Sequence, residues 1–319
     1  METIQIFCEN TSSLHDVKPG AKLSELCKTI NHKCQYRALG AIVDNQLKEL
    51  SYSVYSPHII KFIDLSHPDG RRMYIRSLSF LAQRCALDLF PEHRLTFNYS
   101  LPSGLYGEII EKKKGEDGKY KALRLSAEQV ALLKSKMEEY VELDLPFIKK
   151  KLPKDIASSI FRENGYQAKA ILAEESKQYF ISTYYLDGYA DTYYGPLLDS
   201  TGYLNLFDVI PYSNGFCLQA PSTSEPWKVA DYKYQDKLNE IFKEHSEWND
   251  ILGIESLAHL NKAVSIGKTA PLIQIAEALH ERKYANIADM IYSRREQVKL
   301  VLIAGPSSSG KTTSSTRIA

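Results

Sequence analysis

The residues best placed to do chemistry lie near the carboxyl end of the sequence. Residues 305–312 read Gly-Pro-Ser-Ser-Ser-Gly-Lys-Thr, which matches the pattern G-x-x-x-x-G-K-[ST] in full. Glycine at two positions of such a loop permits positive φ and lets the backbone approach a ligand closely. Successive main-chain N–H groups at the start of a helix then form a concave site for an anion. This run therefore predicts a loop that binds the phosphates of a nucleotide.

Two side chains of this loop have predicted roles in chemistry. Lys311 would reach the β- and γ-phosphates as a point charge and is the predicted catalytic residue, and the Thr312 hydroxyl would hold Mg²⁺. The predicted cofactors are therefore ATP and Mg²⁺. The alternative for this run is a flexible linker rich in serine and glycine. The predicted nucleotide-binding residues are Gly305, Pro306, Ser307, Ser308, Ser309, Gly310, Lys311, Thr312 and Thr313.

A strand and a helix must flank such a loop to position it. Residues 298–304 are aliphatic and partly β-branched, which predicts a strand buried on both faces of a parallel sheet, and residues 313–319 can begin a helix. Only seven residues follow Thr312, too few for a metal-binding aspartate and an acceptor site. We therefore expect the sequence to be the N-terminal part of a longer protein and to be inactive as it stands.

The composition of the sequence limits the classes of protein to which it can belong. The 319 residues carry 40 Lys and Arg against 39 Asp and Glu, so the net charge of +1 argues against a protein that coats a polyanion. The length predicts two or three domains. Five cysteines without a CxxC pair fit a reducing compartment. Without a signal peptide or a long apolar run, the sequence predicts a cytoplasmic protein with no membrane contact.

The first 66 residues predict a small β-and-α module. Strands are expected over 3–7, 38–43 and 59–65, with a turn over 15–20 and a helix over 23–30. The order of elements resembles the ubiquitin-like β-grasp TGS domain at the head of threonyl-tRNA synthetases. Cys27, His32 and Cys34 lie close in sequence, but no fourth metal ligand is evident and a buried thiol is the favoured interpretation.

Residues 67–225 predict a second α+β domain. It should contain a buried helix from Met73 that ends before Pro91, and a helix that follows a capping box of Ser126 and Gln129, with apolar residues at helical spacing at Val130, Leu133, Met137 and Tyr140. Its order of elements is similar to the editing domain of threonyl- and alanyl-tRNA synthetases, which carries an HxxxH pair on an early helix and a Cys and a His around a Gly-Pro turn. In this sequence those four positions fall on Arg76, Phe80, Tyr193 and Leu197. None of these side chains supplies a thiolate or a neutral imidazole, so we predict no zinc site and no editing chemistry.

Two further features of this domain have an alternative in nucleic-acid binding. The tyrosines between 184 and 203 are predicted to pack in a sheet rather than to stack on bases, because no Arg or Lys accompanies them in sequence. The lysine run in residues 147–152 predicts a solvated hairpin tip, with a nucleic-acid contact as the alternative.

Residues 226–297 predict a helical connector with two helices on either side of Arg282-Lys283. The chain as a whole resembles the bacterial uridine kinase-like (phosphoribulokinase/uridine kinase) proteins that carry a synthetase-like N-terminal extension, and the resemblance is strongest from about residue 250 to the end. That resemblance implies an α+β multidomain protein: a β-grasp domain over 1–66, an editing-like domain over 67–225, the connector, and the first strand, loop and helix of an α/β P-loop domain over 298–319.

The function implied by this resemblance is that of an ATP-dependent kinase, which transfers the γ-phosphate to a hydroxyl of a nucleoside or similar small molecule. The alternatives are a tRNA-binding or regulatory protein built on a degenerate editing domain, and a P-loop ATPase of another class. We rank tRNA binding below the nucleoside acceptor, and the oligomeric state stays open.

Overall fold

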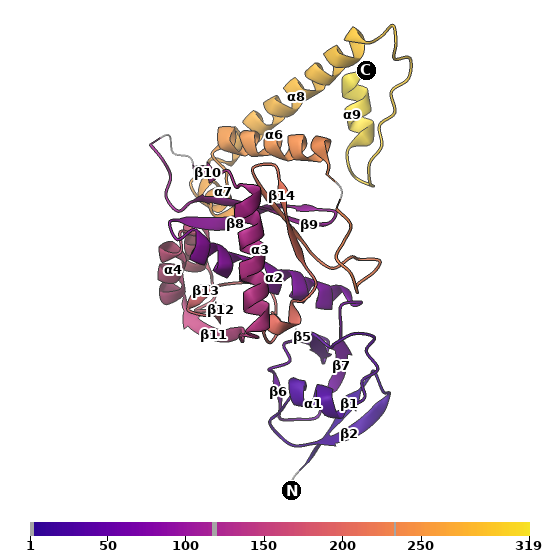
Figure 1. The fold of residues 1–319 in the computed structure, drawn as a ribbon. Coiled ribbons are helices and arrows are strands. Elements are labelled where there is room, and N and C mark those ends of the chain that lie inside the picture. The colour runs from indigo at the N-terminus through magenta and orange to yellow at the C-terminus, as the bar shows by residue number, and fades with distance from the viewer. Residues whose placement is uncertain (1–2, 117–119, 233) are drawn as a thin grey trace. The chain divides into compact units, whose positions relative to one another are not determined.

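The computed structural model describes residues 3–116, 120–232 and 234–319, and it has the mixed α+β architecture expected from the sequence (Figure 1). Several separate sheets are interspersed with helices along the chain. The chain divides into two compact units, residues 1–236 and residues 237–319.

The N-terminal part of the first unit is a five-stranded sheet with one helix. The strand order is β2-β1-β7-β4-β5, and β1 and β7 run parallel. Helix α1 (Leu23–Thr29) buries Leu23 and Leu26 in the core of this sheet. The strands are β1 (Ile4–Cys8), β2 (Ser13–Val17), β4 (Gly40–Val43), β5 (Gln46–Lys48) and β7 (Ile59–Ile63), with a short ladder of β3 (Ala21–Lys22) and β6 (Ser53–Val54) beside them. The predicted turn over 15–20 is thus partly strand, because β2 pairs with β1 up to Val17.

The rest of the first unit is built around helix α2 (Pro68–Leu89), which contributes twelve buried residues and ends before Pro91, as predicted. A second helix, α3 (Ala127–Glu142), packs beside α2 and against a sheet of order β10-β9-β15-β14, with β8 paired to β9. The Ser126 and Gln129 side chains form the predicted capping box at the start of α3. These strands are β8 (His93–Leu101), β9 (Gly104–Glu111), β10 (Ala122–Leu123), β14 (Asp208–Tyr212) and β15 (Gly215–Gln219).

A three-stranded antiparallel sheet completes this unit, in the order β11-β12-β13. Its strand β11 lies at an edge and pairs only with β12 among the described strands, so one row of its main-chain groups faces away from the sheet. The strands are β11 (Ile148–Pro153), β12 (Phe180–Leu186) and β13 (Tyr189–Asp191), and helices α4 (Lys154–Glu163) and α5 (Gln167–Glu175) connect β11 to β12.

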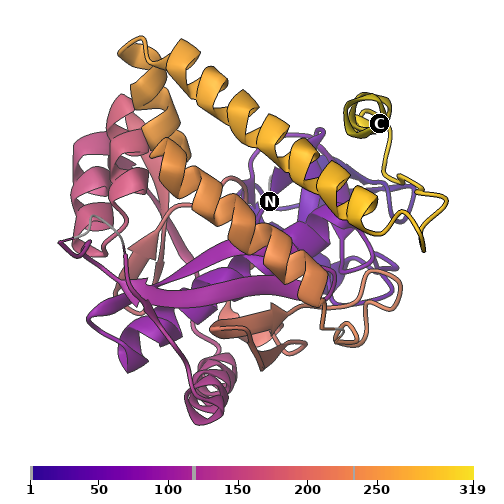
Figure 2. The same ribbon diagram turned by 90° about the horizontal axis from the view of Figure 1, so that it is seen from above.

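The second unit is helical. It consists of α6 (Asp236–Leu252), α7 (Leu257–Ser265), α8 (Thr269–Ser293) and α9 (Lys311–Ile318). Helix α8 is continuous across Arg282 and Lys283, so the predicted pair of helices is one helix, which the gold ribbon in Figure 2 shows as a single rod. Both residues are good helix formers, and no glycine or proline interrupts the helix there.

The predicted strand over 298–304 is not formed. These residues have no regular secondary structure, and Leu300 and Leu302 are 75% and 83% exposed. A strand needs a neighbour to satisfy its main-chain groups, and none of the strands in the described parts of the chain pairs with this segment. None of the helices over the same parts is long and apolar enough to cross a membrane.

Candidate nucleic-acid interface

The loop predicted to bind phosphate lies exposed at the start of α9. Gly310 has a φ of 74° and is the N-cap of the helix, and Ser308 has a φ of 60°. The Lys311 Nζ donates a hydrogen bond to the Pro306 carbonyl oxygen at 2.6 Å, so the lysine is bonded within its own loop. Helix α9 contacts α8, where Ser314 lies 3.3 Å from the Tyr284 hydroxyl.

The four positions of the editing-domain pattern come together in space. Two lie one turn apart on α2, and the other two lie on either side of the turn at Gly195-Pro196. Arg76 donates from Nε to the Pro196 carbonyl oxygen at 3.2 Å and from Nη1 to the Tyr194 carbonyl oxygen at 3.3 Å. Its guanidinium therefore binds the turn directly, and burial lowers the pKa of Arg76.

Gly195 is required for this contact. It has a φ of +118°, and a Cβ placed on it would lie 2.9 Å from the guanidinium carbon of Arg76. Any larger residue at this position would push the arginine away from the turn. The Nη2 atom of Arg76 is buried without a hydrogen-bond partner, which leaves an unused donor at this point of the turn.

Phe80, Tyr193 and Leu197 fill the space between α2 and the turn. Phe80 and Leu197 are fully buried, and the rings of Phe80 and Tyr193 have centroids 5.5 Å apart. The Tyr193 hydroxyl donates to Oε1 of Gln83. Burial raises the pKa of Tyr193, and so does the nearby Asp191. In the described residues, no group of three or more His, Cys, Asp or Glu could hold a metal ion. The place is packed by aromatic and aliphatic side chains.

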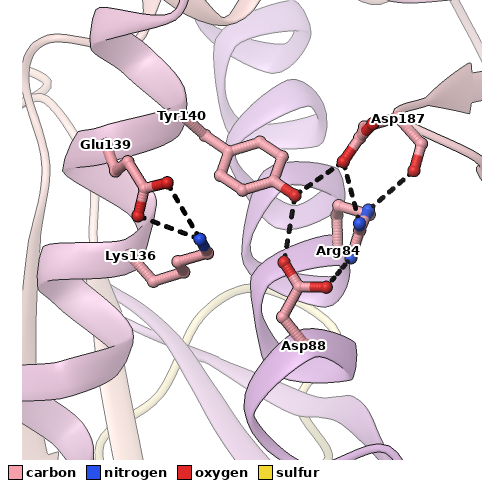
Figure 3. A network of polar contacts seen from close by, with 6 residues as sticks. All are labelled: Arg84, Asp88, Lys136, Glu139, Tyr140 and Asp187. Carbon is pink, nitrogen blue, oxygen red and sulfur yellow. Dashed lines mark hydrogen bonds and ion pairs between the residues drawn. The ribbon is translucent and has the colours of Figure 1, made fainter.

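A polar network fixes the far end of α2 (Figure 3). The Tyr140 hydroxyl lies 2.8 Å from Asp187 and 3.0 Å from Asp88, and Arg84 pairs with both carboxylates. Arg84 also donates from Nε to the main-chain oxygen of Asp187 at 2.9 Å. Because Arg84 and Asp88 lie on α2, Tyr140 on α3 and Asp187 in the turn between β12 and β13, the network joins three elements. The network holds α2 in place relative to the three-stranded sheet β11-β12-β13.

Along β11, sequence reasoning kept a nucleic-acid contact only as the alternative, and it missed the edge strand and the aromatic residues beside it. Ile148, Lys149, Lys150 and Lys151 are all exposed, and in the structure they form an edge strand instead of the predicted hairpin tip. Two exposed aromatic residues, Tyr179 and Phe180, lie where β12 begins, opposite the end of β11. We call Lys149, Lys150, Lys151, Tyr179 and Phe180 the β11 edge.

The lysines of the β11 edge lie next to tyrosines after all. Lys149 Nζ is 5.3 Å from the ring centroid of Tyr184, and Lys150 Nζ is 4.7 Å from that of Tyr185. The argument that no cation accompanies these tyrosines was wrong, because the lysines come from a strand more than thirty residues away. Tyr184 itself is buried, as predicted, whereas Tyr194 is 94% exposed.

A chain of contacts connects the β11 edge to the Arg76 turn. The Tyr184 hydroxyl lies 3.5 Å from the Gly195 carbonyl oxygen and donates to Glu49 of the N-terminal sheet region. Lys149 forms an ion pair with the same Glu49 at 2.8 Å. Burial raises the pKa of Tyr184, and the Glu49 carboxylate adds to this. Lys149, Glu49 and the buried ring of Tyr184 thus connect β11 to the turn at Gly195.

Comparison with known proteins finds relatives among the threonine–tRNA ligases. No family model matches the chain. The chain is 22% identical over 205 residues to the threonine–tRNA ligase of Symbiobacterium thermophilum, which covers 64% of this chain and 30% of the ligase. It is 21% identical over 275 residues to that of Clostridium kluyveri (86% and 40%), and 25% identical over 192 residues to that of Rubrobacter xylanophilus (60% and 28%). The matches span at most 40% of these ligases.

These relatives overturn the predicted activity. The named homologues are threonine–tRNA ligases, so the prediction of an ATP-dependent, uridine kinase-like enzyme is wrong, and the nucleoside acceptor has no support. They favour instead the alternative of a protein related to tRNA synthetases. The prediction was wrong because a loop that binds phosphate is shared by many activities, and the resemblance to kinases was strongest only from about residue 250 to the end of the sequence. A large part of this chain is therefore similar in sequence to part of the threonine–tRNA ligases.

Proposed function

We propose that this chain binds tRNA and does not hydrolyse the ester bond of an aminoacyl-tRNA. The observation that carries the proposal is the homology to threonine–tRNA ligases, which extends over 60–86% of the chain in the relatives described above. The proteins in which this stretch occurs are named for their action on tRNA. The β11 edge supplies a surface of the right chemistry on the same stretch.

We infer the finer architecture from the same relationship. Residues 1–66 are a β-grasp domain of the TGS type, which the parallel pairing of β1 and β7 and the single helix α1 support. Residues 67–225 are an editing-like domain, which the contact between α2 and the turn at 193–197 supports. Residues 226–297 are a helical connector. Residues 298–319 carry a loop whose residue pattern fits ATP and Mg²⁺, although no strand among the described residues pairs with the segment before it.

The β11 edge suits a single-stranded part of an RNA. Lysines spaced along an edge strand can follow a phosphate backbone, and neutralising phosphates releases counterions. Exposed rings such as those of Tyr179 and Phe180 offer faces on which bases stack, at about 1–3 kcal/mol per base. Because neither interaction reads a base edge, we expect the affinity to depend strongly on salt and weakly on sequence.

We expect no hydrolysis of an aminoacyl ester because all four ligand positions of the editing-domain pattern carry other residues. Arg76 hydrogen-bonds the turn, and Phe80, Tyr193 and Leu197 pack together, so no thiolate or imidazole stands at any of them. Neither a metal-bound water nor a general base is available from these residues to attack an aminoacyl ester. We therefore assign this place a structural role beside the RNA-binding surface.

The test is a binding titration with fluorescently labelled tRNA at several salt concentrations. We expect Lys150→Ala combined with Lys151→Ala to weaken binding and to reduce the slope of log K against log salt by about 1–2. The matched control is Lys237→Ala combined with Lys243→Ala, which removes the same charge from two exposed lysines of α6. The proposal fails if the two double variants bind alike, or if the wild-type chain does not bind tRNA at low salt.

A second pair of variants separates stacking from charge. Tyr179→Ala combined with Phe180→Ala should weaken binding at every salt concentration without changing the slope, because stacking releases no counterions. An unchanged affinity in this variant would remove the aromatic residues from the interface and leave a purely electrostatic one.

A further inference from the structure

Three exposed apolar side chains form a row across the N-terminal sheet. Phe7 of β1 lies opposite Leu14 of β2 on one side and beside Ile59 of β7 on the other. Phe7 is 37% exposed, Leu14 61% and Ile59 52%. Side chains alternate between the two faces of a strand, and the neighbouring residues Ile6 and Ile60 are buried in the core that holds α1. The row therefore lies on the face of the sheet that points away from α1, and we call Leu14, Phe7 and Ile59 the outer row.

The same face of this sheet already forms an interface within the chain. Ile63 of β7 is buried in the cluster that contains the core of α2, and Ile42 of β4 and Leu47 of β5 pack against that cluster. Ile63 lies four positions from Ile59 on the same strand, so the two side chains point to the same face. One end of the face is thus covered by the rest of the first unit, and the outer row continues it into solvent. Adjacent exposed apolar side chains of this kind mark an interaction surface.

Acidic side chains flank the outer row on the same face. Asp16 lies two residues beyond Leu14 on β2 and is exposed. Glu9 lies two residues beyond Phe7 and is also exposed. Its carboxylate is 3.9 Å from the Nζ atom of Lys61, so the charge of that lysine is already balanced. Asp16 therefore leaves this side of the row negatively charged.

Asp44 adds a carboxylate on the other side of the row. Its Oδ1 atom accepts a hydrogen bond from the Ile59 main-chain N–H at 2.9 Å, and its Oδ2 atom lies 2.5 Å from Nδ1 of His58. The bond from Ile59 and the bond with His58 lower the pKa of Asp44, so the carboxylate is ionised at neutral pH. Because Asp16 contributes a further charge, the surroundings of the row stay negative even when His58 is protonated. Such a surface repels a phosphate backbone and attracts a cationic partner.

The spacing of the outer row matches one face of an α-helix. Neighbouring strands lie about 4.8 Å apart, so Leu14 and Ile59, two strands apart, are separated by about 10 Å across the sheet. Residues i and i+7 of a helix are about 10.5 Å apart along the axis, and residue i+4 lies between them on the same face. A helix that lies across the strands can therefore place one apolar side chain against each member of the row.

We propose that the outer row binds a basic amphipathic helix of another protein. Apolar residues at i, i+4 and i+7 of that helix contact the row, and its Lys or Arg residues face Asp16 and Asp44. A second copy of this chain is a less suitable occupant, because it would bring the same carboxylates against these and like charges that face each other cost affinity. The proposal does not depend on tRNA binding, since the outer row and the lysines of the β11 edge attract partners of opposite charge.

The experiment titrates the full 319-residue chain with a fluorescently labelled synthetic peptide. The peptide has about 18 residues, long enough to form a helix, with leucine at i, i+4 and i+7 and lysine or alanine elsewhere. We expect binding with a Kd of about 10–100 μM and changes of amide NMR signals in β1, β2 and β7. A peptide with glutamate in place of each lysine should bind about tenfold more weakly or worse. The proposal is overturned if the basic peptide does not bind at about 1 mM, if both peptides bind equally, or if the signal changes lie outside these strands.

A pair of double variants connects binding to the outer row. Leu14→Thr combined with Ile59→Thr removes two exposed apolar side chains and keeps residue types that suit a strand, so we expect the basic peptide to bind about tenfold more weakly. The matched control, Leu143→Thr combined with Ile148→Thr, makes the same replacements at exposed positions outside the N-terminal sheet and should leave the affinity unchanged. Equal affinities of the two double variants would reject the site. Sedimentation at several protein concentrations tests the other occupant: a dimer that only the Leu14 and Ile59 variant dissociates would assign the row to a second copy and overturn the proposal.

Discussion

The rings of Phe80 and Tyr193 pack with centroids 5.5 Å apart and an angle of 58° between their planes. They stand at two of the positions where the editing-domain pattern has a histidine and a cysteine. Phe80 also contacts the rings of Phe147 and Tyr189 at 5.7 Å, so it lies at the centre of an aromatic cluster. A place that holds polar ligands in the resembled domain is here part of the hydrophobic core.

This packing predicts a large loss of stability on truncation. Phe80→Ala should lower the free energy of unfolding by about 3–5 kcal/mol, since it removes a fully buried ring and leaves a cavity. Tyr193→Phe should cost about 1–3 kcal/mol, because Gln83 loses the hydroxyl that bonds its oxygen. Urea denaturation followed by circular dichroism measures both. If both variants changed the free energy of unfolding equally and only slightly, Phe80 and Tyr193 would not lie in a packed core.

The chain should contain no zinc at the turn between 193 and 197. We expect elemental analysis of the purified protein to find less than stoichiometric zinc, and we expect a chelator to leave the melting temperature unchanged, because Arg76, Phe80, Tyr193 and Leu197 cannot ligate the ion. The same preparation should not deacylate a mischarged tRNA above the rate of the uncatalysed reaction. One bound zinc per chain whose removal lowers the melting temperature would refute this prediction.

The network around Tyr140 should make stability depend on acid pH. The hydrogen bond from Tyr140 and the ion pair with Arg84 lower the pKa of Asp187. A carboxylate with a lowered pKa stabilises the fold above the ordinary range near pH 4 and loses that contribution as the pH falls through its folded value. The free energy of unfolding should therefore fall more steeply between about pH 5 and 3 in the wild type than in Asp187→Asn.

Tyr140→Phe provides the companion measurement. It removes the donor that both Asp88 and Asp187 share, so it should lower stability at neutral pH and flatten the acid dependence. Leu132→Ala, at an exposed position of the same helix, is the matched control and should do neither. Parallel pH profiles for wild type, Asp187→Asn and Tyr140→Phe would show that the network does not couple to folding.

The loop at 305–313 should bind Mg-ATP weakly or not at all in this chain. The segment before it has no paired strand, and Lys311 donates to Pro306 within the loop, so the phosphate site is not preorganised. Isothermal titration with Mg-ATP should give no saturable heat in the micromolar range. A clear saturable isotherm that Lys311→Ala abolishes would show that the loop forms its site without a paired strand.

The sequence by itself determined the features that local interactions control. The apolar spacing of Val130, Leu133, Met137 and Tyr140 and the capping pair Ser126 and Gln129 predicted α3, because a helix satisfies its hydrogen bonds within one segment. The replacement of four polar positions by Arg76, Phe80, Tyr193 and Leu197 could also be read directly from residue types.

Only the tertiary structure showed which segments far apart in the sequence pair as strands and which of their side chains meet. Residues 298–304 have the composition of a strand but no strand to pair with among the described residues, and a strand cannot satisfy its main-chain groups alone. Lys149 and Tyr184 lie 35 positions apart in sequence and meet through the pairing of β11 with β12. Composition and spacing carry no information about such pairings, because the register of two strands is set by the turns and faces of the whole sheet.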